Sequence, residues 1–203
     1  PSGPSPFVAI LAGATLKHRY EIYDVVSGRK IGETPASSSS GVAALSDDGA
    51  YLVVQSSGLK TLEVFDIRGK KSLGLLQIAE ADKPFQVSDL AIWKHRLVAL
   101  SNVHKGIKVW ELPSGNLVHT LMGDDKFSSS YGYSFSPGGR YLAVDGQFLE
   151  KRIDFYDLEA GIKKGSISPA GTTRVSELEA LGFSREGTHF AAIYGIDLFG
   201  SPA

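Results

Sequence analysis

The sequence predicts an all-β fold, a β-propeller of four-stranded antiparallel blades. Two observations predict it. An aromatic residue followed by an acid recurs at intervals of 42, 45 and 46 residues, and short apolar runs joined by tight turns fill those intervals. Four short strands in about 40–45 residues are the signature of one propeller blade. Helical periodicity is nearly absent, so we expect an architecture built from strands.

The composition is that of a folded chain with many turns. Of the 203 residues, 42% are hydrophobic, which is enough for a sizeable core, and there are 23 glycines and 9 prolines. The absence of cysteine excludes disulfides, thiolate–zinc sites and a cysteine nucleophile, and leaves the compartment open. The net charge of −1 provides no basic excess for phosphate backbones, so we expect no nucleic-acid partner.

The aromatic–acid pairs mark the third strand of each blade. They are Tyr23-Asp24, Phe65-Asp66, Trp110-Glu111 and Tyr156-Asp157. We expect the aromatic side chains to fill the space between neighbouring blades, and the acids to cap N–H groups of the turn that follows. A ring of carboxylates for cations is the alternative, and the regular recurrence favours capping.

Hairpins with a Ser-x-x-Gly turn supply the first and second strands of the blades. They occur at 42–54, 133–144 and 181–193, and a related segment at 88–101 replaces the glycine turn with Lys94-His95. A short apolar strand at 72–78, 116–121 or 162–167 completes three of the units. The segment 174–183 could be helical for a turn or two, but the repeat places a strand in its second half. The resulting units, after a linker at 1–6, lie at 7–34, 41–78, 87–121, 131–167 and 178–194 of a single propeller domain or propeller fragment spanning 7–203.

The expected strands number seventeen, which is not a multiple of four. The first unit holds three, at 7–12, 20–25 and 30–34, and the last holds two, at 178–184 and 189–194. About four and a half blades are therefore present, and a part of a larger propeller is favoured over a ring that closes irregularly. The apolar terminal strands could pair with another chain, so self-association is a further expectation.

The repeats resemble those of the WD-repeat and wider TolB/YVTN-like β-propellers over about residues 7–194. The resemblance rests on SFSPGGRYLAV at 134–144 and IKVWELPSGNLVHTL at 107–121. The repeats are degenerate, because the Gly-His pair that the WD class carries before the first strand is missing from every unit. The resemblance implies a propeller scaffold that binds a protein or peptide.

No catalytic motif stands out. GYSFS at 132–136 lacks the closing glycine of a nucleophile elbow, and GETPASSSSG at 32–41 lacks the lysine of a phosphate loop. The histidines lie in separate segments, and a metal shared by His18 and His104 across a central channel is the less favoured reading. The sequence therefore predicts no cofactor and no metal site. The longest apolar stretch, 7–14, is far too short to span a membrane, so we expect a soluble chain.

Candidate binding residues lie in two sets of connections that share one face of a propeller, here called the loop face. Connections between second and third strands are basic, and those between units carry acids and aromatic residues. The candidates are Lys17, His18, Arg19, Lys60, Phe85, His104, Lys105, Phe127, Tyr131, Phe148, Lys151 and Arg152. Loops on a rigid scaffold often bind partners. We therefore expect a non-catalytic module for a protein or peptide. The alternative is an enzyme or small-ligand binder that uses the central channel, with His18, Lys60, His104 and Arg152 as its converging set.

Overall fold

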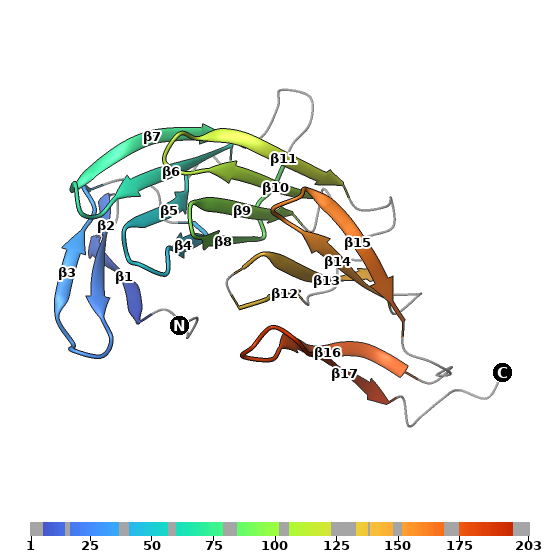
Figure 1. Cartoon of the computed structure of the whole chain (residues 1–203). Helices are drawn as coiled ribbons and strands as arrows, with labels where there is room; N and C mark the ends of the chain where they lie inside the picture. The colour runs from blue at the N-terminus through green and yellow to red at the C-terminus, as the bar shows by residue number, and fades with distance from the viewer. Residues whose placement is uncertain are drawn as a thin grey trace. The chain divides into compact units, whose positions relative to one another are not determined.

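The computed structural model describes residues 6–14, 17–36, 41–56, 60–78, 85–101, 106–122, 133–137, 139–147, 152–168 and 175–196. Within these ranges the chain forms seventeen strands and no helix (Figure 1). The all-β prediction is confirmed. The strand count also agrees with the count expected from the repeats.

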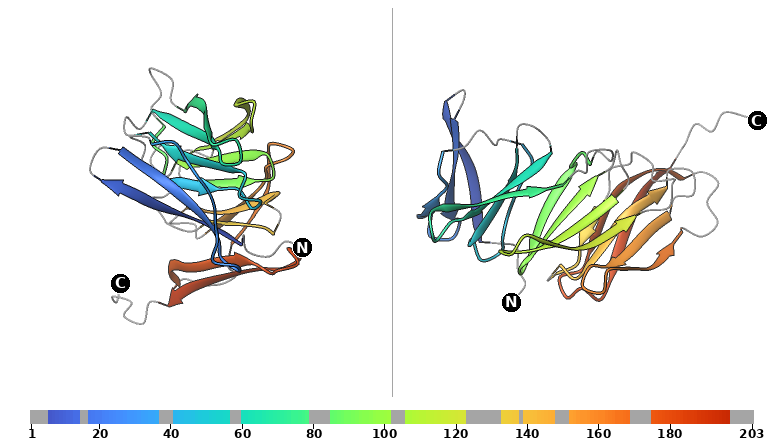
Figure 2. Two further views of the ribbon diagram at one scale, coloured as in Figure 1. Left: turned by 90° about the vertical axis from the view of Figure 1, so that its left-hand side faces the viewer. Right: turned by 90° about the horizontal axis from the view of Figure 1, so that it is seen from above.

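The strands form five sheets, and in each sheet they follow one another in chain order (Figure 2). The first sheet holds β1 (Phe7–Ala14), β2 (Lys17–Asp24) and β3 (Lys30–Glu33). The second holds β4 (Ala43–Leu45), β5 (Tyr51–Gln55), β6 (Thr61–Asp66) and β7 (Lys71–Gln77). The third holds β8 (Asp89–Trp93), β9 (Arg96–Ser101), β10 (Gly106–Glu111) and β11 (Asn116–Met122). The fourth holds β12 (Tyr133–Phe135), β13 (Tyr141–Gln147), β14 (Arg152–Asp157) and β15 (Ile162–Ile167), and the last holds β16 (Val175–Phe183) and β17 (Phe190–Ile196).

Several strand boundaries differ from the sequence prediction, most clearly in the first and last hairpins. The first hairpin is longer, because β1 and β2 stay in register from the Phe7–Asp24 pair to the Ala14–Lys17 pair. Its basic residues therefore lie in a strand. The segment that could have been helical is strand β16, which pairs along its length with β17.

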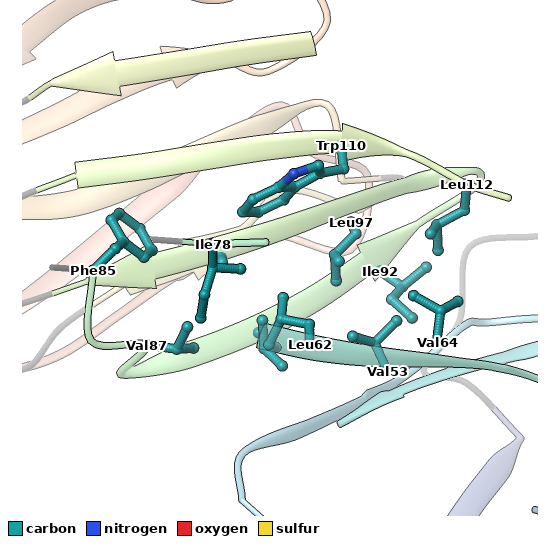
Figure 3. Packing of buried hydrophobic residues seen from close by; sticks show 12 residues of the cluster. Val53, Leu62, Val64, Ile78, Phe85, Val87, Ile92, Leu97, Trp110 and Leu112 are labelled. Atoms are coloured by element: carbon teal, nitrogen blue, oxygen red, sulfur yellow. The ribbon is translucent and has the colours of Figure 1, made fainter. Parts of the chain in front are cut away.

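By its contacts the chain separates into two compact units, Gly3–Val118 and the unit that contains His119–Ala203. In the first unit, consecutive sheets pack face to face. Tyr20 and Ile22 of the first sheet cover Leu52, Val54 and Phe65 of the second. The opposite face of the second sheet packs on the third, where one cluster contains Val53, Leu62, Val64, Leu97, Ala99 and Trp110 (Figure 3). Alternating side chains thus bury both faces of a middle sheet.

In the second unit, three phenylalanines join the fourth sheet to the last. Phe155 lies 5.0 Å from Phe190 and 6.4 Å from Phe183 between ring centroids, and all three pairs meet edge to face. Such pairs add to the burial of apolar area. Phe155 and Ile22 occupy the same register position in their sheets, one residue before the repeated aromatic side chain.

The repeated aromatic side chains are core residues in three sheets. Phe65, Trp110 and Tyr156 are buried, as predicted. Tyr23 of the first sheet is less completely buried than the other three, and the opposing Val8 is 41% exposed.

A β-bulge recurs in the outer strand of three sheets. The pairing register slips by one residue just before Tyr23, Phe65 and Tyr156. The skipped residues are Ile31, Leu73 and Lys164, and each is followed by a glycine. Bulges bend a strand and interrupt its hydrogen-bonding edge, which hinders unwanted pairing with other strands.

Candidate functional site

The structure describes about half of the residues predicted for the loop face. His104, Lys105, Phe127, Tyr131, Phe148 and Lys151 lie outside the described residues. Lys17, His18 and Arg19 belong to β2, and Arg152 begins β14, so the prediction that these four lie in loops is wrong. Backbone pairing with β1 and β13 extends β2 and β14 to include these residues. Of the described candidates, only Lys60 is an exposed residue in a connection, where it lies just before β6.

Arg19 takes part in an ion-pair cluster on the first sheet. Its guanidinium lies 3.1 Å from the Glu21 carboxylate, and Lys30 Nζ lies 2.9 Å from Glu21 and 2.6 Å from Glu33. The Tyr23 hydroxyl donates to Glu21 at 2.9 Å. The hydrogen bond from Lys30, followed by that from Tyr23, lowers the pKa of Glu21 below its usual value. The basic side chain expected to face a partner is thus engaged by an acid of its own strand.

Arg152 forms an equivalent cluster on the fourth sheet. Its Nε lies 2.9 Å from Asp154, and Lys163 Nζ lies 2.9 Å from the other carboxylate oxygen. The Ser166 hydroxyl donates to Asp154 at 2.6 Å. Asp154 is buried, and burying a carboxylate is costly unless it is paired and hydrogen-bonded, as it is here.

The two clusters follow one spacing that the sequence analysis missed. In each, the acid lies two residues before the repeated aromatic residue and the lysine nine residues after the acid: Glu21 with Lys30, and Asp154 with Lys163. At the same spacing, Ser72 donates to Glu63 in the second sheet. Alignment of the repeats beyond the aromatic–acid pair would have revealed this cross-strand pairing.

Phe85 is a core residue, and its prediction as an exposed aromatic anchor is wrong. Its ring is buried in the cluster between the second and third sheets. Lys108 Nζ lies 4.9 Å above the ring and donates to the Ile78 carbonyl at 2.7 Å. The Phe85 side chain therefore points into the core, where a cation–π contact with Lys108 holds it.

The repeated acids cap turns at the end of the blades opposite the loop face. Asp24 Oδ1 accepts hydrogen bonds from the N–H groups of Val26 and Ser27 at 2.8 and 3.0 Å. Asp66 accepts from Gly69 at 2.8 Å, and Asp157 accepts from the two N–H groups that follow Leu158. The prediction that these acids cap local N–H groups is confirmed for the three aspartates.

Asp157 has a second role in the fourth sheet. Arg140 donates to it from Nη2 at 3.0 Å, and the hydrogen bond from this guanidinium lowers the pKa of Asp157 below its usual value. Arg140 also lies 3.3 Å from Glu159 and its guanidinium carbon lies 5.3 Å from the Tyr141 ring centroid. The arrangement fixes the turn between β14 and β15.

Within the described ranges, no three histidine, aspartate or glutamate side chains gather closely enough to hold a metal ion. His119 of the second unit contacts a neighbouring sheet, where its Nε2 lies 3.2 Å from the Glu159 carbonyl oxygen. Among all the residues that the structure describes, no helix is long and apolar enough to cross a membrane.

Sequence comparisons show no relative: no family model matches the chain, and no curated protein matches it. Solved structures do resemble it. One is hydrazine synthase of Kuenenia stuttgartiensis, with a TM-score of 0.57, 18% identity, and coverage of 94% of this chain and 56% of that one. Another is a chain of the mitotic checkpoint complex, with a TM-score of 0.60, 18% identity, and coverage of 94% of this chain and 54% of that one.

These likenesses and the sheets described above define the class: the chain has a β-propeller fold built from antiparallel blades. The chain spans a little over half the length of both structures.

Proposed function

We propose that the chain is a non-catalytic propeller scaffold of the WD-repeat or TolB/YVTN-like kind, which binds a protein or peptide through its loop face. In this proposal residues 7–203 form one propeller domain, or part of one, and residues 1–6 are a linker. The observation that carries it is the propeller fold combined with the contrast between the two ends of the blades. At one end, the turns after β2, β6 and β14 are closed by the aspartates that begin them. At the other end, β3, β7, β11 and β15 finish, and seven to eleven residues of sequence separate each of them from the first strand of the next sheet.

The likeness to a chain of the mitotic checkpoint complex supports this proposal, because that propeller is part of a protein assembly. Long connections on a rigid sheet scaffold are the positions at which such folds vary their contacts. Lys60 is the described loop-face candidate with an exposed side chain in a connection, so it is the first residue to test.

The experiment is quantitative capture of partners by the immobilised chain, compared with two charge-reversal variants. Lys60→Glu alters the loop-face end of β6, and Lys70→Glu alters the exposed turn at the opposite end of the same strand. We expect Lys60→Glu to weaken capture of the same proteins about tenfold and Lys70→Glu to leave it unchanged. Equal effects of the two variants would contradict binding through the loop face.

The second candidate is a propeller that binds a small ligand or acts as an enzyme through its central channel. It is favoured by the likeness to hydrazine synthase, an enzyme. A thermal-shift screen with metals, quinones and sugars separates the two functions, since a ligand at a hundred times its Kd adds about 2.7 kcal/mol of stability. A strong stabilisation by one small molecule would favour this second function over the first.

A further inference from the structure

The first sheet exposes two side chains at register positions that are buried in the three four-stranded sheets. Val8 lies opposite Tyr23 and Ile10 opposite Glu21. The same positions of the second, third and fourth sheets hold Leu52, Val54, Leu97, Ala99, Leu142 and Val144, and all six are buried. Val8 is 41% exposed and Ile10 is 50% exposed. We refer to Val8, Ile10 and Tyr23 as the first-sheet face.

The repeats show what kind of surface covers such a face. Leu52 and Val54 are covered by Tyr20 and Ile22 of the preceding sheet. Leu97, Ala99 and Trp110 are likewise packed against Val53, Leu62 and Val64 of the preceding sheet. In both cases the cover is the alternate face of an antiparallel sheet, carrying aliphatic or aromatic side chains every second residue.

The last sheet carries an exposed face of this kind. The backbone hydrogen bond that closes the Ser-x-x-Gly turn reaches the carbonyl of Tyr51 in the second sheet and of His189 in the last. Leu52 and Phe190 each follow that residue directly, so they occupy equivalent positions. Ala191 and Ile193 therefore occupy the positions of Val53 and Gln55, on the alternate face. Ile193 is 57% exposed and pairs with Ala180, which is also exposed. We refer to Ala180, Ala191 and Ile193 as the last-sheet face.

We propose that the first-sheet face of one copy of this chain docks on the last-sheet face of a second copy, reproducing the packing of consecutive sheets. Small alanines around Ile193 leave room for Val8 and Ile10, and each chain carries both halves of the contact. The ion pairs beside the first-sheet face are compatible with this docking. At the position equivalent to Glu21, Asp154 is buried while it is paired with Arg152 and Lys163.

The contact joins two different surfaces, so it is head-to-tail rather than symmetric. That property gives a sharp test by sedimentation velocity of the 203-residue chain over a range of concentrations. We expect the unmodified chain to associate, and Ile10→Lys and Ile193→Lys each to raise the dissociation constant at least about tenfold. An equimolar mixture of the two variants should form a 1:1 dimer, because each keeps the half that the other has lost.

Val26→Lys is the matched control. Val26 is 87% exposed on the turn after β2, outside both faces, so its replacement should leave association unchanged. If a lysine variant loses the circular dichroism spectrum of the unmodified chain, Ile10→Thr and Ile193→Thr replace the pair in the same mixture. A monomer at all concentrations overturns the proposal, and so does a mixture that fails to dimerise. The loop-face proposal is tested separately, because Lys60→Glu alters neither face.

Discussion

At the residue scale, the fold depends on one large side chain per blade that closes the space between sheets. Trp110 is buried among Val53, Leu97 and other aliphatic side chains, while Tyr23 at the same repeat position is only partly buried. The free energy gained from an aromatic side chain at this repeat position therefore depends on whether a sheet covers it.

We expect Trp110→Ala to lower the free energy of unfolding by about 3–5 kcal/mol, because it removes a fully packed indole and leaves a cavity. Denaturant unfolding measures the change. Tyr23→Ala is the matched variant, and it should cost clearly less. A cost below about 1 kcal/mol for Trp110→Ala would contradict its place in the core.

The Arg140–Asp157 pair predicts a pH dependence. Because the Arg140 guanidinium lowers the folded-state pKa of Asp157, the carboxylate stabilises the fold at pH values above its ordinary pKa of about 4. This stabilisation is lost as the pH falls through the lower, folded-state pKa. We expect Asp157→Asn to be less stable than the unmodified chain near pH 7, and the difference to shrink in acid, as followed by thermal unfolding. Adding Arg140→Gln to both chains should reduce the stability difference that Asp157→Asn causes. A stability difference that widens in acid would contradict this role of the pair.

At the element scale, the outer strands combine regular pairing with a bulge at a fixed place. Gly74 follows the bulged Leu73 and has a φ of +121°, a conformation that side chains other than glycine rarely adopt. A Cβ at Gly74 would meet no atom within 4 Å, so only the backbone opposes substitution there.

We expect Gly74→Ala to destabilise the chain by about 1–2 kcal/mol through backbone strain alone. Gly182→Ala in β16 is the matched control, because its Cβ would also enter open space and its φ lies outside the left-handed region. That replacement should be neutral or slightly stabilising. Equal costs in chemical denaturation would show that the bulge does not need its glycine.

Much of this element order could be predicted from the sequence, because tight turns and period-two patterns are local signals. The strand at 162–167 has the expected bounds, and the strand at 116–121 is longer by one residue. The candidate site was predicted less well, since it depended on where each strand ends. Whether Arg19 and Arg152 lie in a strand depends on their pairing partners in β1 and β13 rather than on their own residue type. Phe85 packs in the core beside Lys108 of another strand, a contact that no local pattern reveals.

At the scale of the whole molecule, each four-stranded sheet has a gradient of burial from its middle strands to its outer strand. In the second sheet, four of the five residues of β5 are buried and six of the seven residues of β7 are exposed. In the fourth sheet, four of the six residues of β14 are buried and every residue of β15 is exposed. Middle strands also donate and accept hydrogen bonds on both edges. Local opening should therefore begin at the outer strands in both compact units.

Hydrogen–deuterium exchange followed by mass spectrometry measures this gradient directly. We expect amides of β5, β6, β13 and β14 to exchange slowest and those of β7 and β15, the outer strands of the same two sheets, to exchange at least about tenfold faster, since exposed strands with one unpaired edge open without disturbing the core. The comparison is internal to each sheet, so differences between the two units do not affect it. Uniform exchange across a sheet would mean that the outer strand opens only with the whole blade, and slow exchange confined to β7 and β15 would mean that another surface covers the outer strands in solution.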